Sequence, residues 1–361
     1  MSSVSNQFIE LFGFKEFAGH RKILISSAGT AKRNNLKQYL EPEDVLYAEV
    51  LPNPSLSQLV NFFRIIQPTP KDIVFGIGGG SVIDFSKLVA LFAATPSNEI
   101  KGIIESTRFG SIQKALRLIS VPTLFGSGAE QTPFAVCYIG KKKYSVANSL
   151  ILPTRVEYIP EINISAPTNT KLANVLDCFC QAAESLTARN ANNVSLEFAE
   201  KTLRLLVPIA KEYVNGNSVV LASKMAEASN LCGKAIAISK TTGPHAMSYY
   251  LTSVLNWTHG KAVAFTFVYF LEKYRSFESK DVSIQRLFQL LNEILPDETI
   301  ELFFRSLGLE MNLLALEATE SVDFTIWINS VNIERLTNGP NVDMSWLEKN
   351  EMQSFYKLIS N

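Results

Sequence analysis

Cysteine is rare in this chain of 361 residues: there are four, and none forms a C-x-x-C pair. This pattern argues against a disulfide framework and is typical of a reduced, cytoplasmic protein. An excess of charge of one sign is also missing, because 34 Lys and Arg residues balance 34 Asp and Glu residues. The balance argues against nucleic acid or an anionic membrane as the main partner.

Long apolar runs are absent as well. None approaches the roughly 20 residues of a membrane-spanning helix, and the opening stretch MSSVSNQFIE lacks the charged and apolar regions of a secretory signal. We therefore expect no membrane association. Apolar residues nevertheless make up 47% of the chain, which suits two domains or one large domain with a substantial core.

Short apolar runs alternate with helical patterns in the first half of the chain. Gly140 occupies the turn of a predicted hairpin at 134–148, and a helical pattern covers 81–94. Strands are predicted at 21–27, 45–50, 72–79 and 116–123. Apolar strands separated by helices are typical of a parallel sheet with crossover helices.

From about residue 166 the strand signals fade. Amphipathic helix patterns cover 170–188, 195–214, 223–239 and 284–295. The stretch S-A-P-T-N-T at 165–170 supplies a proline break and capping candidates before the first of them. We predict an α/β domain, residues 1–165, followed by an all-helical domain, residues 166–361.

Two loops of small residues follow predicted strands. In G-I-G-G-G-S-V-I-D at 76–84, the glycines let the backbone approach a ligand, and the free N–H groups of the next helix suit a pyrophosphate. Ser81 and Asp84 have capping-box spacing. The second loop is P-T-L-F-G-S-G-A-E at 122–130. The first loop alone is also compatible with a tight turn without a ligand, but the two loops together predict one dinucleotide crevice at the carboxyl ends of the strands.

Histidine is as scarce as cysteine, yet His245 and His259 lie fourteen positions apart in HAMSYYLTSVLNWTHG. This stretch, with GGGSVID, PTLFGSGAEQTPFAV, DCFCQAAES and RLTNGP, resembles the iron-containing (group III) alcohol dehydrogenases in order and spacing. KKYSVANSLILP, SLTARNAN and ISKTTGPHAMSYYLTS are most similar to its phosphonoacetaldehyde reductase-like branch. The resemblance implies a dinucleotide-binding α/β domain, a helical metal domain and a cleft between them.

The resemblance also implies a divalent metal, Fe²⁺ or Zn²⁺, held by Asp177, Gln181, His245 and His259. The family usually carries a histidine where this chain has Gln181, one helical turn from Asp177, and an amide is a weaker ligand. Two alternatives remain: a three-ligand centre with a vacant coordination position, or a site of low metal affinity. Tyr249 lies one turn beyond His245 and is expected either to relay protons to the substrate oxygen or simply to pack against neighbouring side chains.

The implied chemistry is hydride transfer between a nicotinamide and a small aldehyde or alcohol, with the metal polarising the carbonyl. By resemblance, Thr123 and Ser127 line the nicotinamide side and Lys143 lies near the cofactor. The full set of expected cofactor residues is Gly29, Thr30, Lys32, Gly78, Gly79, Gly80, Ser81, Asp84, Thr123, Ser127 and Lys143.

The residues after the first strand predict a preference for NADPH over NADH. An NAD site usually has an acid there to bind the ribose 2′-hydroxyl, but none occurs between His20 and Glu41. Gly29, Thr30 and Lys32, with the neighbouring arginine, offer a small turn, a hydroxyl and cations for a 2′-phosphate instead. An ordinary basic helix start is the alternative.

A substrate site is predicted at Lys240, Thr241 and Thr242, just before His245. A cation and two hydroxyls suit an anionic tail, and the branch resemblance implies phosphonoacetaldehyde, which would give 2-hydroxyethylphosphonate. The alternative is a capping turn with Lys240 in solvent.

Two other functions share the implied architecture. A metal-dependent lyase or cyclase of the dehydroquinate synthase type would need a basic cluster that the sequence around the ligand helices lacks. A non-catalytic nucleotide-binding relative stays open because Gln181 departs from the family pattern. The oligomeric state is open too, a homodimer included.

Overall fold

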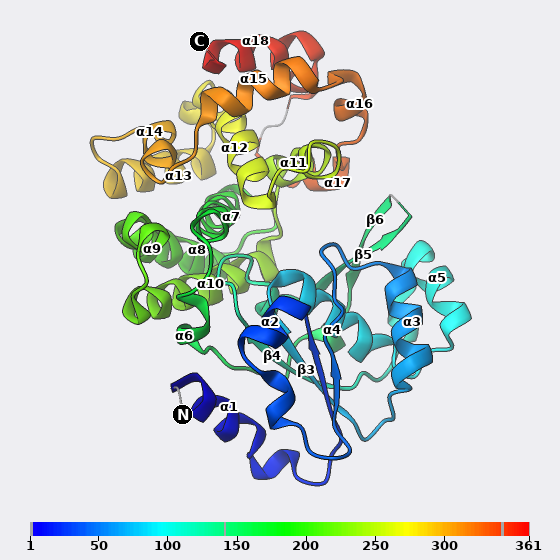
Figure 1. The fold of residues 1–361 in the computed structure, drawn as a ribbon. Coiled ribbons are helices and arrows are strands. Elements are labelled where there is room, and N and C mark those ends of the chain that lie inside the picture. Colours follow the sequence, from blue (N-terminus) through cyan, green and yellow to red (C-terminus); the bar gives the residue numbers. More distant parts are fainter. Residues whose placement is uncertain (1–2, 141, 341–342, 361) are drawn as a thin grey trace. The chain divides into compact units, whose positions relative to one another are not determined.

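The computed structural model describes residues 3–140, 142–340 and 343–360. The chain divides into two compact units, Met1–Ala166 and Pro167–Asn361. The first unit contains a parallel sheet with helices and the second is built of helices, which confirms the predicted fold class (Figure 1).

Five parallel strands form the sheet of the first unit, in the order β2-β1-β3-β4-β7. They are β1 (Lys22–Ser26), β2 (Val45–Tyr47), β3 (Ile73–Gly78), β4 (Arg117–Pro122) and β7 (Arg155–Val156). A separate antiparallel hairpin joins β5 (Phe134–Ile139) to β6 (Lys142–Ala147). The four predicted strands and the hairpin are confirmed, with Gly140 at φ 60° in the turn. The two-residue β7 is too short to give a sequence signal.

Both faces of this sheet are covered, which explains why its strands are continuous apolar runs. Ile23 and Ile25 of β1 pack with residues of α3 and α4, whereas Leu24 between them packs with residues of α1. The helices of this unit are α1 (Ser3–Phe12), α2 (Ala28–Arg33), α3 (Leu56–Ile66), α4 (Gly80–Phe92), α5 (Ser97–Ser106) and α6 (Pro160–Asn163), with 3-10 turns η1 (Lys15–Phe17), η2 (Leu36–Tyr39), η3 (Phe109–Ser111), η4 (Ala129–Gln131) and η5 (Ser149–Ile151).

The start of α4 differs from the prediction. The helix begins at Gly80 with Gly79 as its N-cap and no side-chain cap, so the expected capping box of Ser81 and Asp84 is wrong. The Asp84 carboxylate instead accepts the backbone N–H of Val136 in β5 at 3.1 Å. A residue expected to stabilise its own helix therefore ties that helix to the hairpin.

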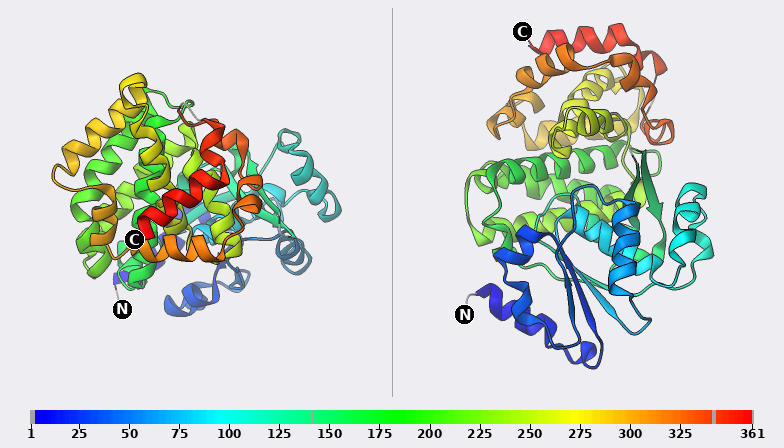
Figure 2. Two further views of the ribbon diagram at one scale, coloured as in Figure 1. Left: turned by 90° about the horizontal axis from the view of Figure 1, so that it is seen from above. Right: turned by 45° about the vertical axis from the view of Figure 1, so that its right-hand side comes forward.

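In the second unit, the helix α7 packs against α8, α10, α12 and α13. Figure 2 shows α15 and α18, in orange and red, lying side by side. The helices are α7 (Thr168–Thr187), α8 (Asn193–Leu206), α9 (Ala210–Asn215), α10 (Val219–Ser239), α11 (Gly243–Val254), α12 (His259–Arg275), α13 (Val282–Ile294), α14 (Ile300–Ser306), α15 (Met311–Ser321), α16 (Phe324–Asn329), α17 (Ile333–Leu336) and α18 (Lys349–Ser360), with η6 (Val207–Ile209), η7 (Glu278–Lys280) and η8 (Met344–Leu347).

Two details of these helices depart from expectation. The pattern at 195–214 is split, because Pro208 lies in η6 between α8 and α9 and cannot donate a helical hydrogen bond. Helix α7 begins after Pro167 without a side-chain cap, although polar candidates surround it. Within the described ranges, no helix combines the length and hydropathy needed to cross a lipid bilayer.

Candidate metal centre and nucleotide-binding loops

Three helices of the second unit bring Asp177, His245 and His259 together. Asp177 lies in the middle of α7, His245 in the first turn of α11, and His259 at the start of α12. The Asp177 Oδ1 atom lies 3.3 Å from His245 Nε2 and 3.8 Å from His259 Nε2. One donor atom of each residue lies within 4.8 Å of the other two.

A close contact between backbones places His259. A Cβ atom on the next residue, Gly260, would lie 1.8 Å from the carbonyl oxygen of Ala173 in α7. The start of α12 therefore rests directly on α7, one turn before Asp177. Any larger residue at Gly260 would move His259 away from the other two side chains.

The donor set fits a divalent metal. Ligands at the 2.0–2.2 Å typical of zinc–nitrogen and zinc–oxygen bonds lie about 3.3–3.6 Å apart around a tetrahedral ion. The separations of Asp177 from His245 and His259 are close to that range. One carboxylate and two imidazoles suit Zn²⁺ or Fe²⁺ and leave room for a further ligand.

A buried carboxylate that the sequence analysis did not select holds His245 in place. Glu184, two turns after Asp177 on α7, accepts a hydrogen bond from His245 Nδ1 at 2.5 Å through Oε1. Its Oε2 accepts the backbone N–H of Thr242 at 2.6 Å and the Thr242 hydroxyl at 2.8 Å. With Nδ1 carrying the proton, the Nε2 lone pair of His245 faces Asp177 and the metal position.

The same two carboxylates control the protonation of His245. Burial alone lowers the pKa of this imidazole, but Glu184 and Asp177 more than offset burial and raise the pKa to about 9. Without metal, the imidazolium form therefore predominates at neutral pH. A metal ion at Nε2 must displace that proton, which couples metal binding to pH.

Gln181 shares the buried face of α7 with Asp177, as its spacing predicts. Its amide oxygen accepts the thiol hydrogen of Cys232 at 3.2 Å, and the same sulfur lies 3.4 Å from the Cys178 carbonyl oxygen. The oxygen that would bind a metal is therefore already engaged. The expectation that Gln181 is at most a weak ligand stays a prediction.

The turn before His245 is hydrogen-bonded to Glu184. Thr242 is fully buried, and both its N–H and its hydroxyl donate to Glu184. That hydroxyl already donates to Glu184, and the predicted role of Thr242 in binding substrate stays a prediction. Lys240 is exposed at the end of α10, where its φ of 58° ends the helix.

Asn338, from the RLTNGP motif, fixes this turn. Its side-chain amide donates to the carbonyl oxygens of Ser239 at 2.9 Å and Thr241 at 3.2 Å. Its backbone carbonyl accepts the N–H of Arg189 at 2.7 Å, just beyond the end of α7. This motif near the end of the described chain thus holds the turn on which His245 depends.

Tyr249 lies one turn beyond His245 on α11 and is half-buried. The Arg335 guanidinium of α17 lies 5.5 Å from the centre of its ring. Tyr249 is therefore not simply packed in an apolar core.

In the first unit, the two predicted small-residue loops meet at the carboxyl ends of β3 and β4. The backbone N–H of Thr123 donates to the Gly78 carbonyl at 3.0 Å. A Cβ atom on Gly80 would lie 3.3 Å from the Ser127 hydroxyl oxygen, which shows how closely the two loops approach each other. Ser81 lies in the first turn of α4, where its hydroxyl accepts the N–H of Asn53 at 3.4 Å.

A buried lysine, Lys87, anchors the second loop. The sequence analysis did not select this residue either. Its ammonium group donates to the carbonyl oxygens of Ala129, Thr132 and Phe134 at 2.5, 2.7 and 2.8 Å, and to the Thr132 hydroxyl at 3.2 Å. Burial lowers the pKa of Lys87 to about 8, against the attraction of Asp84 and Glu130. The lysine fastens the loop that follows Ser127 to α4.

The remaining cofactor candidates differ in exposure. Gly29 and Lys32 are exposed on α2, whereas Thr30 is buried and its hydroxyl accepts from Ser27 at 3.1 Å and Arg33 at 3.4 Å. Lys143 is half-buried on β6. Burial raises the pKa of Asp84, while Lys143 is among the groups that lower it.

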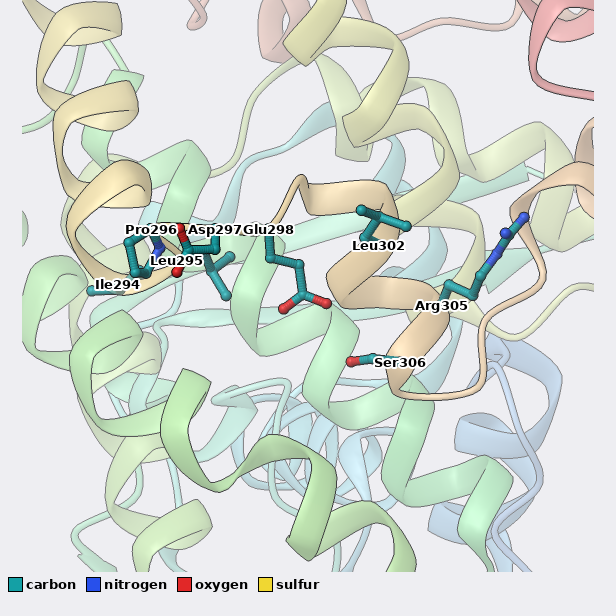
Figure 3. A pocket seen from close by; sticks show the side chains of 8 residues that line it. All are labelled: Ile294, Leu295, Pro296, Asp297, Glu298, Leu302, Arg305 and Ser306. Atoms are coloured by element: carbon teal, nitrogen blue, oxygen red, sulfur yellow. The ribbon is translucent and has the colours of Figure 1, made fainter.

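A hollow elsewhere on the second unit holds none of the predicted site residues. It has a volume of about 630 Å³ and lies at the turn between α13 and α14. Figure 3 shows the lining side chains, with the Arg305 guanidinium turned away from Asp297 and Glu298. Without a histidine or a glycine loop, this hollow offers no counterpart to the Asp177 centre.

The chain matches two family models in succession. The model for iron-containing alcohol dehydrogenase covers residues 11–158, and the model for the C-terminal part of the Fe-containing alcohol dehydrogenase family covers residues 171–334. Phosphonoacetaldehyde reductase of Streptomyces viridochromogenes is 28% identical over 235 residues, which is 63% of this chain and 58% of that protein. Long-chain-alcohol dehydrogenase 1 of Geobacillus thermodenitrificans is 28% identical over 221 residues, 61% of this chain and 56% of that protein.

The chain thus spans under two thirds of the length of these two relatives, whereas solved structures match almost throughout. An iron-containing alcohol dehydrogenase from Thermotoga maritima has a TM-score of 0.80 at 22% identity, over 98% of this chain and 95% of that one. Sulfoacetaldehyde reductase from Bifidobacterium kashiwanohense, in complex with NAD⁺, has a TM-score of 0.83 at 22% identity over the same shares. Because the two family models follow each other in chain order and together cover most of its length, this chain belongs to the iron-containing alcohol dehydrogenase family.

Proposed function

We propose that the protein is a metal-dependent, NAD(P)-linked oxidoreductase that interconverts a small aldehyde and its alcohol. One observation carries the proposal: Asp177, His245 and His259 converge from three helices, and Glu184 orients His245 toward the point of convergence. Family membership supplies the reaction class. In the reducing direction a hydride passes from the nicotinamide to the carbonyl carbon, a proton reaches the oxygen, and the oxidised nucleotide remains.

Asp177, His245 and His259 would hold the metal, which when bound supplies Lewis-acid polarisation of the substrate oxygen. Glu184 keeps the proton of His245 on Nδ1, so that the ring binds as a neutral imidazole. The Tyr249 hydroxyl, on the same helix face as His245, is our candidate for passing a proton to the nascent alkoxide.

For the nucleotide, we propose the loops around Gly78–Gly80 and Thr123–Ser127 as the pyrophosphate and nicotinamide sites. Gly79 and Ser81 flank the start of α4, whose thirteen residues give a helix dipole that favours anions. Asp84 and Lys143, which attract each other, would border the cofactor.

We further propose NADPH as the preferred nucleotide. Lys32 is exposed on α2, and Arg33 lies over Thr30. Their positive charges suit a 2′-phosphate, and no acid of this helix opposes them. Thr30 would then act by placing Arg33, since its hydroxyl is used within the helix.

The finer proposal for the substrate is phosphonoacetaldehyde, reduced to 2-hydroxyethylphosphonate. Its support is the similarity to a phosphonoacetaldehyde reductase, at 28% identity. The sequence analysis suggests Lys240 as the cation that would bind the phosphonate.

The test combines turnover with metal analysis. Purified protein loaded with Zn²⁺ or Fe²⁺ is assayed for loss of the reduced-nicotinamide absorbance with a panel of short aldehydes. His259→Ala should lose both bound metal and turnover, whereas His20→Ala, a change at an exposed histidine of the first unit, should lose neither. Full activity in protein shown by elemental analysis to be metal-free would contradict the proposal.

The other two functions predict different outcomes of this test. A lyase or cyclase of the dehydroquinate synthase type would bind metal but show no net oxidation of NADPH with any aldehyde. A non-catalytic relative would bind the nucleotide, and neither metal loading nor any substrate would produce turnover.

A further inference from the structure

Arg335 holds an unusual position for a surface arginine. It lies on the short helix α17, which packs against α11, and its side chain is half-buried. Its guanidinium lies 5.5 Å from the centre of the Tyr249 ring, within the range of a cation–π interaction. The aromatic ring therefore helps to fix the position of the charge.

The guanidinium has no counter-charge among the residues that the structure describes. Arg335 makes none of the ion pairs found there within 4.0 Å, and the hydrogen bonds described for it use its backbone N–H and carbonyl rather than its guanidinium. Arg275, by contrast, lies over Phe288 at 5.7 Å and pairs with Glu272 at 3.1 Å. A partly buried charge without a partner is unfavourable, and an anionic ligand would relieve that cost.

Arg335 is also close to the candidate metal centre along α11. Tyr249 and His245 are four residues apart in this helix, so they share a face and are separated by about 6 Å along its axis. His245 points toward Asp177 from the same face. Tyr249, whose ring carries the Arg335 guanidinium, is therefore one helical turn from the candidate metal ligand His245.

We propose that Arg335, supported by the Tyr249 ring, binds the anionic group of the substrate and selects aldehydes that carry a tetrahedral oxyanion, a phosphonate or a sulfonate, close to the carbonyl. This inference rests on the proposed aldehyde reductase function and assigns its substrate class. A guanidinium offers a planar fork of donors that can bind two oxygens of such a group.

Arg335 fits this role better than the turn before His245. The Thr242 hydroxyl is used by Glu184, and Lys240 is an exposed, flexible cation at the end of α10. Arg335 is held by an aromatic ring on the helix that carries His245, so less freedom is lost when an anion binds.

The test compares matched aldehydes. The value of kcat/KM is measured for phosphonoacetaldehyde, sulfoacetaldehyde and the uncharged 3,3-dimethylbutanal in wild type, Arg335→Gln, Arg335→Lys and Lys240→Gln. Arg275→Gln, a stacked arginine that already has a carboxylate partner, is the control. Ethylphosphonate, which lacks a carbonyl, is tested as a competitive inhibitor.

We expect Arg335→Gln to reduce kcat/KM for the anionic aldehydes by roughly ten- to a hundredfold, mostly through KM, and to weaken ethylphosphonate similarly. The uncharged aldehyde should change by less than about threefold, which shows that the site is intact. Arg335→Lys should recover part of the loss, because it keeps the charge but not the fork. The ratio of phosphonate to sulfonate activity identifies which oxyanion the wild type prefers.

Three results would overturn the inference while leaving the reductase function standing: a wild type that prefers the uncharged aldehyde, equal losses for all aldehydes in Arg335→Gln, or a selective loss in Lys240→Gln alone. Absence of turnover with every aldehyde would instead refute the proposed function. Ethylphosphonate binding that depends on Arg335 would in that case still support an anion site.

Discussion

Replacing Glu184 by Gln isolates the contribution of one buried carboxylate to metal binding. The substitution keeps the shape of the side chain but exchanges one acceptor oxygen for an NH₂ donor. In the native site, one oxygen faces His245 Nδ1 at 2.5 Å and the other faces the Thr242 N–H and hydroxyl at 2.6 and 2.8 Å. An amide can satisfy one of these two sides only.

Either orientation of the amide disturbs the site. If the NH₂ group faces His245, Nδ1 must accept and the proton moves to Nε2, the atom that should bind the metal. If it faces Thr242, two donors meet and the turn before His245 shifts. Loss of such a partner to a metal-binding histidine typically lowers affinity ten- to a hundredfold, or about 1.4–2.7 kcal/mol.

The assay is competition for Zn²⁺ between the protein and a chromophoric chelator at fixed pH. Glu200→Gln is the control, because this glutamate is half-exposed on α8 and pairs with Arg204 on the surface. Its Zn²⁺ affinity should match the wild type. The visible spectrum of the Co²⁺ form reports whether the ligand geometry has changed.

The result that would refute this reasoning is a folded Glu184→Gln protein whose Zn²⁺ affinity lies within about twofold of wild type. Glu184 would then stabilise the turn at Thr242 without orienting His245. Thermal unfolding of the metal-free proteins separates the two effects, since the turn contributes to the stability of the fold with or without metal.

Three further outcomes are expected. Because the folded protein raises the pKa of His245, the protonated histidine should stabilise the metal-free protein fully below about pH 6.5, the pKa of His in the unfolded chain, and this stabilisation should be lost as the pH rises through about 9. Denaturant unfolding in excess chelator should show this pH dependence, and His245→Gln should abolish it. Gln181→His should raise Zn²⁺ affinity by about tenfold or more, because it adds an imidazole on the Asp177 face; an unchanged affinity would place residue 181 outside the ligand sphere. Lys32→Glu should raise KM for NADPH by about tenfold and leave NADH nearly unchanged; equal effects on both nucleotides would contradict a 2′-phosphate contact.

The sequence was informative where local pattern decides structure. Apolar runs predicted the strands β1 to β4, and the turn glycine at Gly140 predicted the hairpin. The resemblance to the family, carried in part by the spacing of His245 and His259, implied the ligand Asp177 as well, and donor atoms of these three residues lie within 4.8 Å of one another. Each of these signals is carried by neighbouring residues or by a motif of fixed length.

Prediction failed where the partner of a side chain lies far along the chain. In the sequence, Glu184 looks like any other polar residue of an amphipathic helix, because its partner His245 is 61 positions away. Lys87 resembles any helical lysine until the loop 42 positions later folds onto it. The capping box failed for a related reason, since Asp84 has a partner 52 positions away in β5 that competes with the local hydrogen bond.

The bonds of Asn338 have a consequence for the order of synthesis. This residue fixes the carbonyl oxygens of Ser239 and Thr241, which lie 99 and 97 positions earlier. On a growing chain, all three metal-binding side chains leave the ribosome well before Asn338 does. A nascent chain can therefore bind a metal ion loosely through these ligands, but the turn that aligns His245 is completed only when the segment at 335–340 has arrived. Metal selection should be a late event in biogenesis, made by a nearly finished chain rather than by an isolated ligand segment.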